Sequence, residues 1–400
     1  MLPPLDLQTA HRLILEQASA LPVQSIVLEE ALHRVSSRSL PALLPLPAFN
    51  LSTRDGFVLG ASADVQGRYR IGGEIAAGDT CKNHLAKGEA WRIMTGALLP
   101  AGGLRVIPQE QCRVEGDTLF ISSKGFLIKN SFIRTKGSEI ARGKIVVPAG
   151  TPIHPEYQAL LAGVGYTEVP VYRRPRVSFF CTGNELVGPT ATKLNGQKVS
   201  ENRFLLNGLT QLFGAIPTDC GLVGDNKNEL RRLFATLDPA QTDVVISTGA
   251  MGPGKYDLLE DAFIEAGGQL IYNALKIRPG RATLFGTLGP SLFFGLPGPP
   301  PAVHLLFHEL VRPALLALQG IKRCLPEIVK VRLTEPVACP EKKILCLKSG
   351  IFQINNGICT ARLARKSEPT SCYLLCPAHR RQLHAGEWIQ AHLTNSPFRG

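Results

Sequence analysis

Apolar and polar residues alternate in two different ways from about residue 175 onward. Short apolar runs, typical of buried strands, are interleaved with segments in which apolar residues recur every three or four positions, as in helices. The predicted strands are residues 177–180, 218–223, 244–247 and 292–296, and the predicted helices are residues 203–213, 228–237, 258–266 and 303–318. Strands that alternate with helices favour a parallel sheet with helices on both faces. We therefore predict a multidomain α/β protein whose centre is a doubly wound, mostly parallel sheet domain over residues 173–320.

The remaining segments predict three smaller parts. Residues 6–20 have helical periodicity with Asp6 as a candidate N-cap, and residues 155–164 are again helical. Between them, short alternating runs separated by Gly, Pro and Asn turns predict an all-β insert. The predicted division is a helical linker domain (residues 1–24 and 142–172), an inserted β-domain (25–141), the α/β domain (173–320) and a C-terminal β-domain (321–400).

Charge and cysteine content narrow the class of partner. The 400 residues carry a formal net charge of +12, but the basic residues are scattered rather than gathered into one stripe. This distribution favours a small anionic ligand, or simple solubility, over a nucleic-acid partner. The first residues show no secretory signal, and prolines interrupt the most apolar stretch, Ser291–Phe307, so no membrane partner is expected. Ten irregularly spaced cysteines are typical of reduced thiols in the cytoplasm, which is the predicted location.

The candidate chemistry gathers around the stretch Asp243–Asp257, which reads as a strand, a glycine-rich loop and the cap of the next helix. Loops that follow parallel strands lie on one edge of the sheet. Here such loops bring Glu185, Asp225 and Asp257, and a separate basic turn, Arg278–Arg281, is available to the same edge. Carboxylates beside arginines and glycines suit a phosphorylated ligand with Mg²⁺. Taken singly, each acid has an alternative interpretation as a helix cap or a surface charge.

Three other constellations have simpler interpretations. His304 and His308 share one helix face at a spacing that suits a metal, but helix packing is the preferred interpretation. The Cys372, Cys376 and His379 group has the residue types of a metal site, yet small apolar fillers of a β-domain explain the cysteines better. Cys181 is a conceivable nucleophile at a strand end, but no neighbouring base accompanies it in the sequence.

Several segments resemble the molybdopterin molybdenumtransferases, the group that includes the C-terminal domain of gephyrin. Their order and spacing match across nearly the whole chain. The matching segments are LPAFNLSTRDGFVLG (46–60), IMTGALLPAGG (93–103), KGSEIARG (136–143), CTGNEL (181–186), STGAMGPGKYD (247–257), KIRPGRATLFG (276–286) and FFGLPGPP (293–300).

The resemblance implies a transferase that inserts molybdate into adenylylated molybdopterin with Mg²⁺ and releases AMP. It also implies a homodimer, with each cleft between the inserted β-domain of one subunit and the α/β domain of the other, and an upstream molybdopterin adenylyltransferase. The catalytic residues that it implies are Asp55, Glu139, Glu185, Asp225 and Asp257, of which Glu185, Asp225 and Asp257 are metal ligands. The substrate-binding residues are Thr95, Thr182, Gly183, Asn202, Ser247, Thr248, Gly249, Arg278, Gly280, Arg281, Pro297 and Gly298.

The chain also departs from the motifs of this family at several positions. Glu139 stands for aspartate, Ser200-Glu201-Asn202 stands for Asp-Ser-Asn, and both lysines of the basic turn are arginines. Further departures are Leu104 for aspartate, Pro299 for asparagine, and Ala250 and Met251 in the glycine-rich loop. These changes leave an alternative open, namely a catalytically impaired paralogue that binds a pterin nucleotide as a carrier or scaffold.

Overall fold

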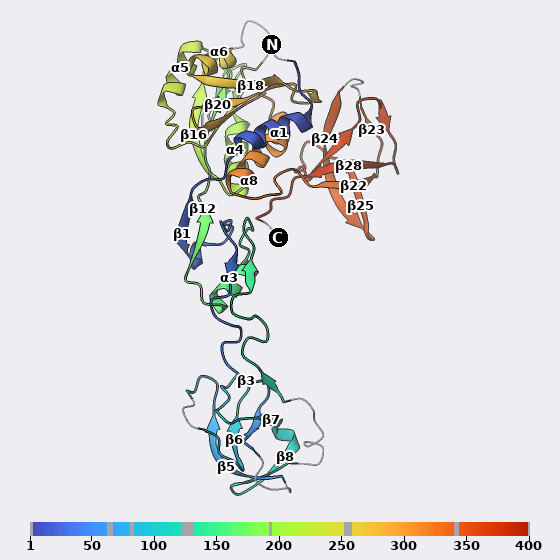
Figure 1. The fold of residues 1–400 in the computed structure, drawn as a ribbon. Coiled ribbons are helices and arrows are strands. Elements are labelled where there is room, and N and C mark those ends of the chain that lie inside the picture. Colours follow the sequence, from blue (N-terminus) through green and yellow to red (C-terminus); the bar gives the residue numbers. More distant parts are fainter. Residues whose placement is uncertain are drawn as a thin grey trace. The chain divides into compact units, whose positions relative to one another are not determined.

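The computed structural model describes residues 3–61, 67–80, 84–121, 131–191, 194–251, 258–339 and 344–398. Internal contacts divide the chain into two compact units. The large unit comprises Met1–Arg38, Ala149–His154 and Val169–Gly400, and the small unit comprises Ser39–Pro148 and Pro155–Glu168. Figure 1 labels elements of both units.

The large unit is built on a six-stranded mixed sheet with the order β16-β13-β17-β21-β20-β18. The first four strands in this order are parallel: β16 (Ile216–Val223), β13 (Arg176–Thr182), β17 (Val244–Thr248) and β21 (Ser291–Leu296). The last two, β20 (Ala282–Leu288) and β18 (Gly268–Ala274), are antiparallel to their neighbours. The sequence predicted the four parallel strands and missed the antiparallel pair.

Helices cover both faces of this sheet, which confirms the doubly wound α/β prediction. On one face, Val177, Phe179 and Ile246 pack with α4 (Glu201–Leu212) and with the helices near residue 310. On the other face, Phe180 and Phe293 pack with α5 (Lys227–Thr236) and α6 (Leu258–Glu265). Neighbouring residues of one strand thus enter different cores, as the alternation of side chains along a strand requires.

One long helical stretch, Pro300–Leu318, runs through the core of the large unit. It consists of α7 (Pro300–Leu306), the π-helical turn η3 (Phe307–Val311) and α8 (Arg312–Leu318). In the described part of the chain this helix is long and apolar enough to cross a membrane, but 83% of its apolar stretch is buried inside the fold. Its apolar surface is therefore the surface that packs against the sheet and against α1 (Leu7–Gln17).

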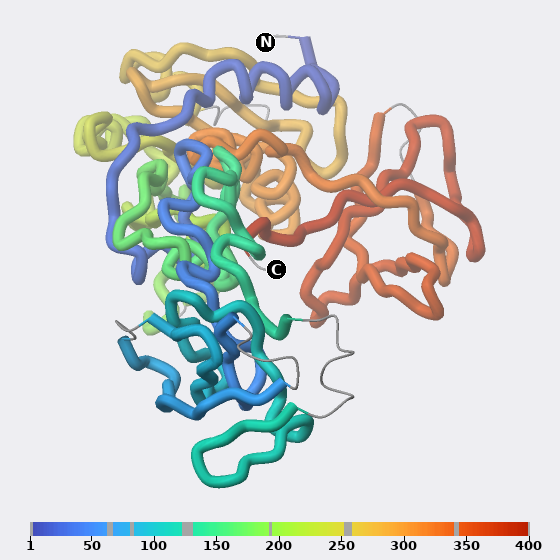
Figure 2. The backbone as a smooth tube through the Cα atoms, turned by 60° about the horizontal axis from the view of Figure 1, so that its bottom comes forward, coloured from blue at the N-terminus to red at the C-terminus, as the bar shows by residue number. Residues whose placement is uncertain are grey.

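The C-terminal strands form a separate β-sheet, coloured orange to red in Figures 1 and 2. Its strand order is β19-β24-β25-β22-β28-β26. The strands are β19 (Ile277–Arg278), β22 (Ile328–Leu333), β24 (Leu345–Asn355), β25 (Ile358–Leu363), β26 (Cys372–Cys376) and β28 (Trp388–Leu393). Four cysteines, Cys339, Cys346, Cys372 and Cys376, are buried in its apolar core, where they fill space as predicted for small apolar side chains.

The small unit contains a six-stranded sheet with the order β7-β4-β6-β5-β9-β8. These strands are β4 (Gly56–Leu59), β5 (Arg68–Ile75), β6 (Glu89–Ile93), β7 (Arg105–Pro108), β8 (Cys112–Glu115) and β9 (Thr118–Ile121). The unit also contains helix α3 (Pro155–Gly163) and the pairs β3 (Leu51–Ser52) with β10 (Ile133–Arg134) and β2 (Leu40–Pro41) with β11 (Ile145–Val147). The four-part domain division stays a prediction, because it combines segments around α1 and α3 that the contacts assign to different units.

The remaining elements are short strand pairs and 3₁₀ turns. They are β1 (Val23–Val27) paired with β12 (Glu168–Tyr172), β14 (Leu186–Val187) paired with β15 (Lys198–Val199), β23 (Val337–Ala338) paired with β27 (Gln382–Leu383), and the 3₁₀ turns η1 (Leu28–Glu30) and η2 (Gln109–Gln111). The predicted N-cap of α1 is confirmed, since the Asp6 side chain accepts a hydrogen bond of 2.8 Å from the Thr9 N–H.

A buried carboxylate ties the C-terminal sheet to the core helix. Glu309, in the π-helical turn, is fully buried, and its oxygens lie 2.9 and 3.1 Å from Nδ1 of His392 on β28. His11 Nε2 on α1 is 3.8 Å from the same carboxylate. Next to this cluster, the Arg312 guanidinium donates to the Leu393 carbonyl oxygen at 3.0 Å. His304 contacts the Tyr373 hydroxyl, so the two helix histidines serve packing, as preferred from the sequence.

We expect His392→Ala to destabilise the large unit by about 3 kcal/mol or more, because removing one partner leaves a buried charge without compensation. Adding Glu309→Gln to that variant should recover part of the loss, since the uncompensated charge is then gone. Urea unfolding of the two variants measures both effects. As a control, breaking the half-exposed pair Arg362–Glu368 in the same sheet should cost less; an equal cost would contradict the role given to Glu309.

Candidate active site at the sheet edge

The strand register brings the predicted loops to one edge of the central sheet. Cys181 of β13 pairs with Thr248 of β17, and Thr248 pairs with Leu296 of β21, so these strands end in one row. On the other side of β13, Thr182 pairs with Val223, just before the loop that carries Asp225. Thr182, Gly183, Glu185, Asp225, Thr248, Gly249, Pro297 and Gly298 therefore all leave the sheet at the same edge.

The basic turn reaches this edge by a different route. β20 runs antiparallel to β21 with Leu284 opposite Gly295, and Ala274 pairs with Ala282, so the turn between β18 and β20 lies at the row where β21 ends. The order of the strands then places Asp225 and Glu185 toward one end of the edge and Arg278 and Arg281 toward the other. From β13 to β20 the strand spacing amounts to roughly 14 Å.

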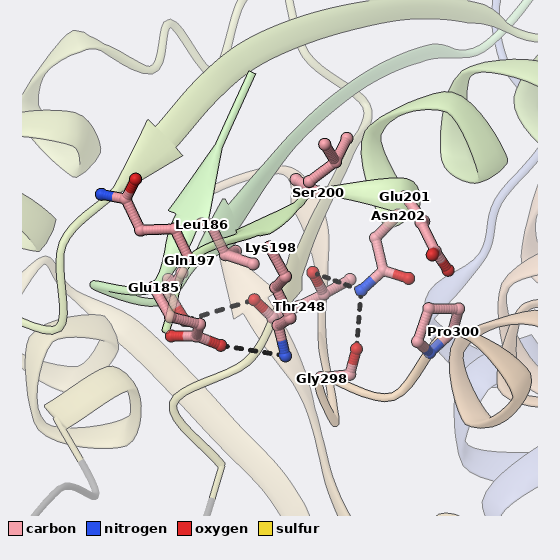
Figure 3. A pocket seen from close by; sticks show the side chains of 12 residues that line it. Glu185, Leu186, Gln197, Lys198, Ser200, Glu201, Asn202, Thr248, Gly298 and Pro300 are labelled. Atoms are coloured by element: carbon pink, nitrogen blue, oxygen red, sulfur yellow. Dashed lines mark hydrogen bonds and ion pairs between the residues drawn. The ribbon is translucent and has the colours of Figure 1, made fainter. Parts of the chain in front are cut away.

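A pocket of about 390 Å³ opens at the β13 end of the edge (Figure 3). Five of the predicted site residues line it: Thr182, Glu185, Asn202, Thr248 and Gly298. The other lining residues are Leu186, Gln197, Lys198, Val199, Ser200, Glu201 and Pro300. These come from the β14–β15 pair and from the N-termini of α4 and α7, so two helix N-termini and three strand ends meet at one pocket.

Asn202 joins three of the elements around the pocket. Its amide Nδ2 donates to the Gly298 carbonyl oxygen at 2.8 Å and contacts Thr248 Oγ1 at 3.2 Å (Figure 3). Thr182 Oγ1 in turn donates to the Thr248 carbonyl oxygen at 3.2 Å. A single side chain at the start of α4 thereby connects the loops that follow β17 and β21.

Gly249 allows the loop after β17 to lie against β13. Its φ of +96° is in the region that side chains rarely adopt, and a Cβ atom there would stand 2.4 Å from the Thr182 carbonyl oxygen. Its N–H donates to the Leu296 carbonyl oxygen at 3.0 Å. Ser247, the second-last residue of β17, is fully buried and does not line the pocket, so it contributes to the strand rather than to the pocket wall.

Glu185 and Asp225, the two predicted metal ligands among the described residues, have different electrostatic surroundings. Burial by itself would raise the pKa of Glu185, but a backbone hydrogen bond and the Lys198 ammonium at 3.0 Å outweigh it, and the pKa is lowered. For Asp225, desolvation is the largest effect and the Glu185 charge adds to it, so its pKa is raised. One Asp225 carboxylate oxygen, Oδ1, is buried without a hydrogen-bond partner among the described residues. Such an oxygen is suited to coordinate a cation or to accept a hydrogen bond.

Asp257, the third predicted metal ligand, lies outside the described residues. In the parts of the chain that are described, no group of three or more His, Cys, Asp or Glu residues has an arrangement that would hold a metal ion. The three-carboxylate set therefore stays a prediction.

The basic turn is held from several sides. Arg278 is part of β19, which pairs in parallel with β24 of the C-terminal sheet. The Leu275 N–H donates to the Arg281 carbonyl oxygen at 2.9 Å and closes the turn. Gly280, with φ +109°, packs against Leu306 of α7, where a Cβ atom would approach within 2.7 Å. Both arginine residues are exposed.

The remaining predicted site residues belong to the small unit. Asp55, in the turn before β4, accepts a hydrogen bond of 2.6 Å from the Thr95 N–H, which is the main cause of its lowered pKa. Glu139 is paired with Arg134 at 3.2 Å. Within this unit, Asp55 and Thr95 thus form one hydrogen-bonded pair.

Sequence reasoning did not assign Lys198, Ser200 or Glu201 to the site. Lys198 reaches Glu185 because β14 pairs with β15, a contact between two-residue strands that leaves no periodic signal. Ser200 and Glu201 have a recognisable local pattern, because a serine followed by an acidic residue just before an apolar helical run is typical of the start of a helix. Applied to the loop before α4, that pattern would have placed a helix N-terminus at this edge.

Comparison with known proteins decides the family. The model described as the MoeA N-terminal region (domain I and II) matches residues 5–165, and the model described as a probable molybdopterin binding domain matches residues 178–317. The molybdopterin molybdenumtransferase of Staphylococcus epidermidis is 29% identical over 408 residues and covers 98% of this chain and 96% of its own. The chain belongs to the molybdopterin molybdenumtransferase family. A Staphylococcus aureus relative of the same name is 28% identical over the same coverage.

Solved structures agree with this family assignment. The molybdopterin biosynthesis MoeA protein from Pyrococcus horikoshii superposes with a TM-score of 0.84 at 25% identity, and the comparison covers 100% of both chains. A second MoeA structure from Pyrococcus horikoshii OT3, at 22% identity and a TM-score of 0.78, supports the fold. The motif resemblance and the multidomain α/β prediction are confirmed for this molybdopterin molybdenumtransferase family member.

The central role of Asn202 is testable without a ligand. We expect Asn202→Ala to speed hydrogen exchange at the Gly249 amide, because the loops after β17 and β21 lose their common partner. The lost hydrogen bonds should also reduce the free energy of unfolding by about 1–3 kcal/mol. The matched control is Asn207→Ala, the same change at an exposed position of the same helix. Equal exchange rates in the two variants would rule out this role.

Proposed function

We propose that the protein is a transferase of molybdenum cofactor biosynthesis that inserts molybdate into adenylylated molybdopterin and releases AMP. The observation that carries this proposal is the charge order along one sheet edge, with carboxylates at the β16–β13 end and two arginines at the β20–β18 end. An elongated ligand with several anionic groups fits such an edge. The names of the relatives, which cover nearly the full chain, support the same reaction.

The carboxylates fit a hard divalent cation. Asp225 and Glu185 are close enough for their charges to interact, and an Asp225 oxygen is buried without a partner in the described chain. Oxygen donors of this kind suit Mg²⁺, and Asp257 would complete the set. When bound, the ion would neutralise charge on the phosphates of the adenylylated pterin. The protein's own part is to position these carboxylates, and for Glu185 a backbone hydrogen bond and Lys198 also favour the ionised form.

The arginines suit the anionic cargo. A guanidinium can hold an oxyanion through two parallel hydrogen bonds, where a lysine offers a point charge. The turn that carries Arg278 and Arg281 is fixed by β24, by Leu306 and by its own hydrogen bonds, so the guanidinium groups start from a positioned backbone. We assign molybdate, or an anionic part of the pterin ligand, to this turn.

Several features belong to the same proposal. The protein acts as a cytoplasmic homodimer in which Asp55, Thr95 and Glu139 of one subunit complete the cleft on the α/β domain of its partner. An upstream molybdopterin adenylyltransferase supplies the adenylylated ligand, and neither nucleic acid nor membrane takes part. The alternative, a paralogue that only carries the pterin nucleotide, is not favoured, because relatives named for the transferase activity match nearly the full length.

A single-turnover experiment tests the reaction. Protein loaded 1:1 with adenylylated molybdopterin, Mg²⁺ and excess molybdate should release AMP faster than the ligand does alone. Tight binding of the ligand without AMP release would instead establish the carrier. Sedimentation of the same sample tests assembly: a monomer that turns over would contradict the shared cleft.

Loss of one carboxylate should stop the reaction without unfolding the protein. We expect Asp257→Asn to lower the rate of AMP release by about two to three orders of magnitude, as losing a positioned electrostatic group commonly does. The control is Asp261→Asn, the same change at an exposed position in the first turn of α6. If Asp257→Asn releases AMP at the unaltered rate, this residue has no part in the mechanism.

A further inference from the structure

Two polar atoms in the pocket wall are buried without a hydrogen-bond partner among the described residues. They are Ser200 Oγ and Asn202 Oδ1, and their residues are 3% and 6% exposed. Both residues line the pocket at the N-terminus of α4. A buried polar atom that lacks a partner is unfavourable, so both atoms favour any ligand group that supplies one.

The free atom of the Asn202 amide is an acceptor. Its other atom is bonded to the Gly298 carbonyl oxygen, which can only accept, so that atom must be the Nδ2 donor. In Figure 3 this nitrogen lies between Thr248 and Gly298, and the Oδ1 oxygen points away from both. The ligand group opposite Oδ1 must therefore carry an O–H or N–H donor.

Ser200 offers a hydroxyl that can donate or accept. The residue is the N-cap of α4, a helix of 12 residues, yet its side chain makes no capping hydrogen bond. The Cys181 thiol is close enough to interact with it, but a thiol is a weak partner and does not satisfy the hydroxyl. The Ser200 hydroxyl is thus available to the pocket.

The unpaired Asn202 oxygen disfavours a phosphate, although a helix N-terminus alone would attract an anion. Glu185 and Glu201 both line the pocket, and the lysine in the lining, Lys198, is already paired with Glu185 at 3.0 Å. The charged residues of the wall therefore sum to one negative charge. An ionised phosphate, which offers only acceptors, would also leave Asn202 Oδ1 without a donor.

We propose that Ser200 and Asn202 form a subsite for the sugar hydroxyls of a nucleotide. A ribose hydroxyl donates to Asn202 Oδ1, and a neighbouring hydroxyl exchanges a hydrogen bond with Ser200 Oγ. The pair of ribose hydroxyls is uncharged and offers donors and acceptors side by side, so it can form hydrogen bonds with both unpaired atoms, Ser200 Oγ and Asn202 Oδ1. This assignment rests on the proposed function only in that the ligand contains a nucleotide.

The test compares AMP with 2′-deoxy-AMP and 3′-deoxy-AMP by isothermal titration calorimetry on the full chain. For the unaltered protein, removal of the contacting hydroxyl should weaken binding about tenfold, the factor that corresponds to one lost hydrogen bond to a buried group. Ser200→Ala should bind AMP more weakly and reduce the difference between AMP and one of the deoxy analogues to less than about threefold.

Thr210→Val is the matched control. Thr210 lies on the same helix, is fully buried and also has a hydroxyl without a partner in the described chain, but it does not line the pocket. This variant should discriminate between AMP and the deoxy analogues as the unaltered protein does. Circular dichroism melting of both variants shows that each is folded.

Equal affinity of the unaltered protein for AMP and both deoxy analogues would overturn the subsite. The Ser200→Ala variant could instead still discriminate between AMP and the deoxy analogues, while the unaltered protein binds IMP, which lacks the amino group of AMP, more weakly than AMP. That result would assign Ser200 Oγ and Asn202 Oδ1 to the adenine base and would also overturn the sugar subsite. Failure to bind AMP at all also overturns it. The proposed function is judged separately, by molybdate-dependent AMP release from the adenylylated pterin.

Discussion

The parallel register of three strands is the constraint on which the candidate site depends. β13, β17 and β21 run in the same direction, and Cys181, Thr248 and Leu296 share one row. Because the strands are parallel, their following loops leave at one edge. The reversal of direction at β20 and β18 then returns the chain to that edge and places the basic turn there. A slip of one residue would move each core side chain to the other face and separate these loops.

Continuous burial explains why the sequence predicted the two central strands β17 and β21. Val244–Thr248 and Ser291–Leu296 are buried at every position, and such runs read as central parallel strands. β18 was missed because its exposed and buried positions are mixed and give no clear period. The π-helical turn at Phe307–Val311 was missed for a related reason, since an apolar stretch buried on all sides looks the same in an α-helix and a π-helix.

The candidate site was predictable to the extent that it follows the strand ends. Glu185, Thr248 and Gly298 were placed correctly at one edge because their positions follow from the strands before them. The contacts of Lys198 and Ser200 depend on how the chain returns between β13 and α4, and no local pattern fixes that path. The arrangement of Asn202 is likewise tertiary, because its partners are 46 and 96 residues away in the sequence.

One helix connects the pocket to the rest of the large unit. Pro300 at its start lines the pocket, and Leu306 packs under Gly280 of the basic turn. Further along, Glu309 and Arg312 contact β28, and β24 of the same sheet pairs with Arg278. The C-terminal sheet is therefore fixed both to the helix and to the turn that the helix supports. The described parts of the C-terminal sheet do not line the pocket. The sheet nevertheless has a physical role at the site, because it fixes the position of the turn that carries Arg278 and Arg281.

The two ends of the sheet edge differ in the kind of group that they accept, and this difference gives a ligand one favourable direction. At the α4 end, the unpaired Asn202 oxygen requires a donor, so an ionised phosphate in contact with it would leave that oxygen unsatisfied. At the β20–β18 end, exposed guanidinium groups offer donors and positive charge to an anion. Reversing the ligand would therefore lose hydrogen bonds at both ends together. Orientation would be selected by two unfavourable contacts as well as by two favourable ones.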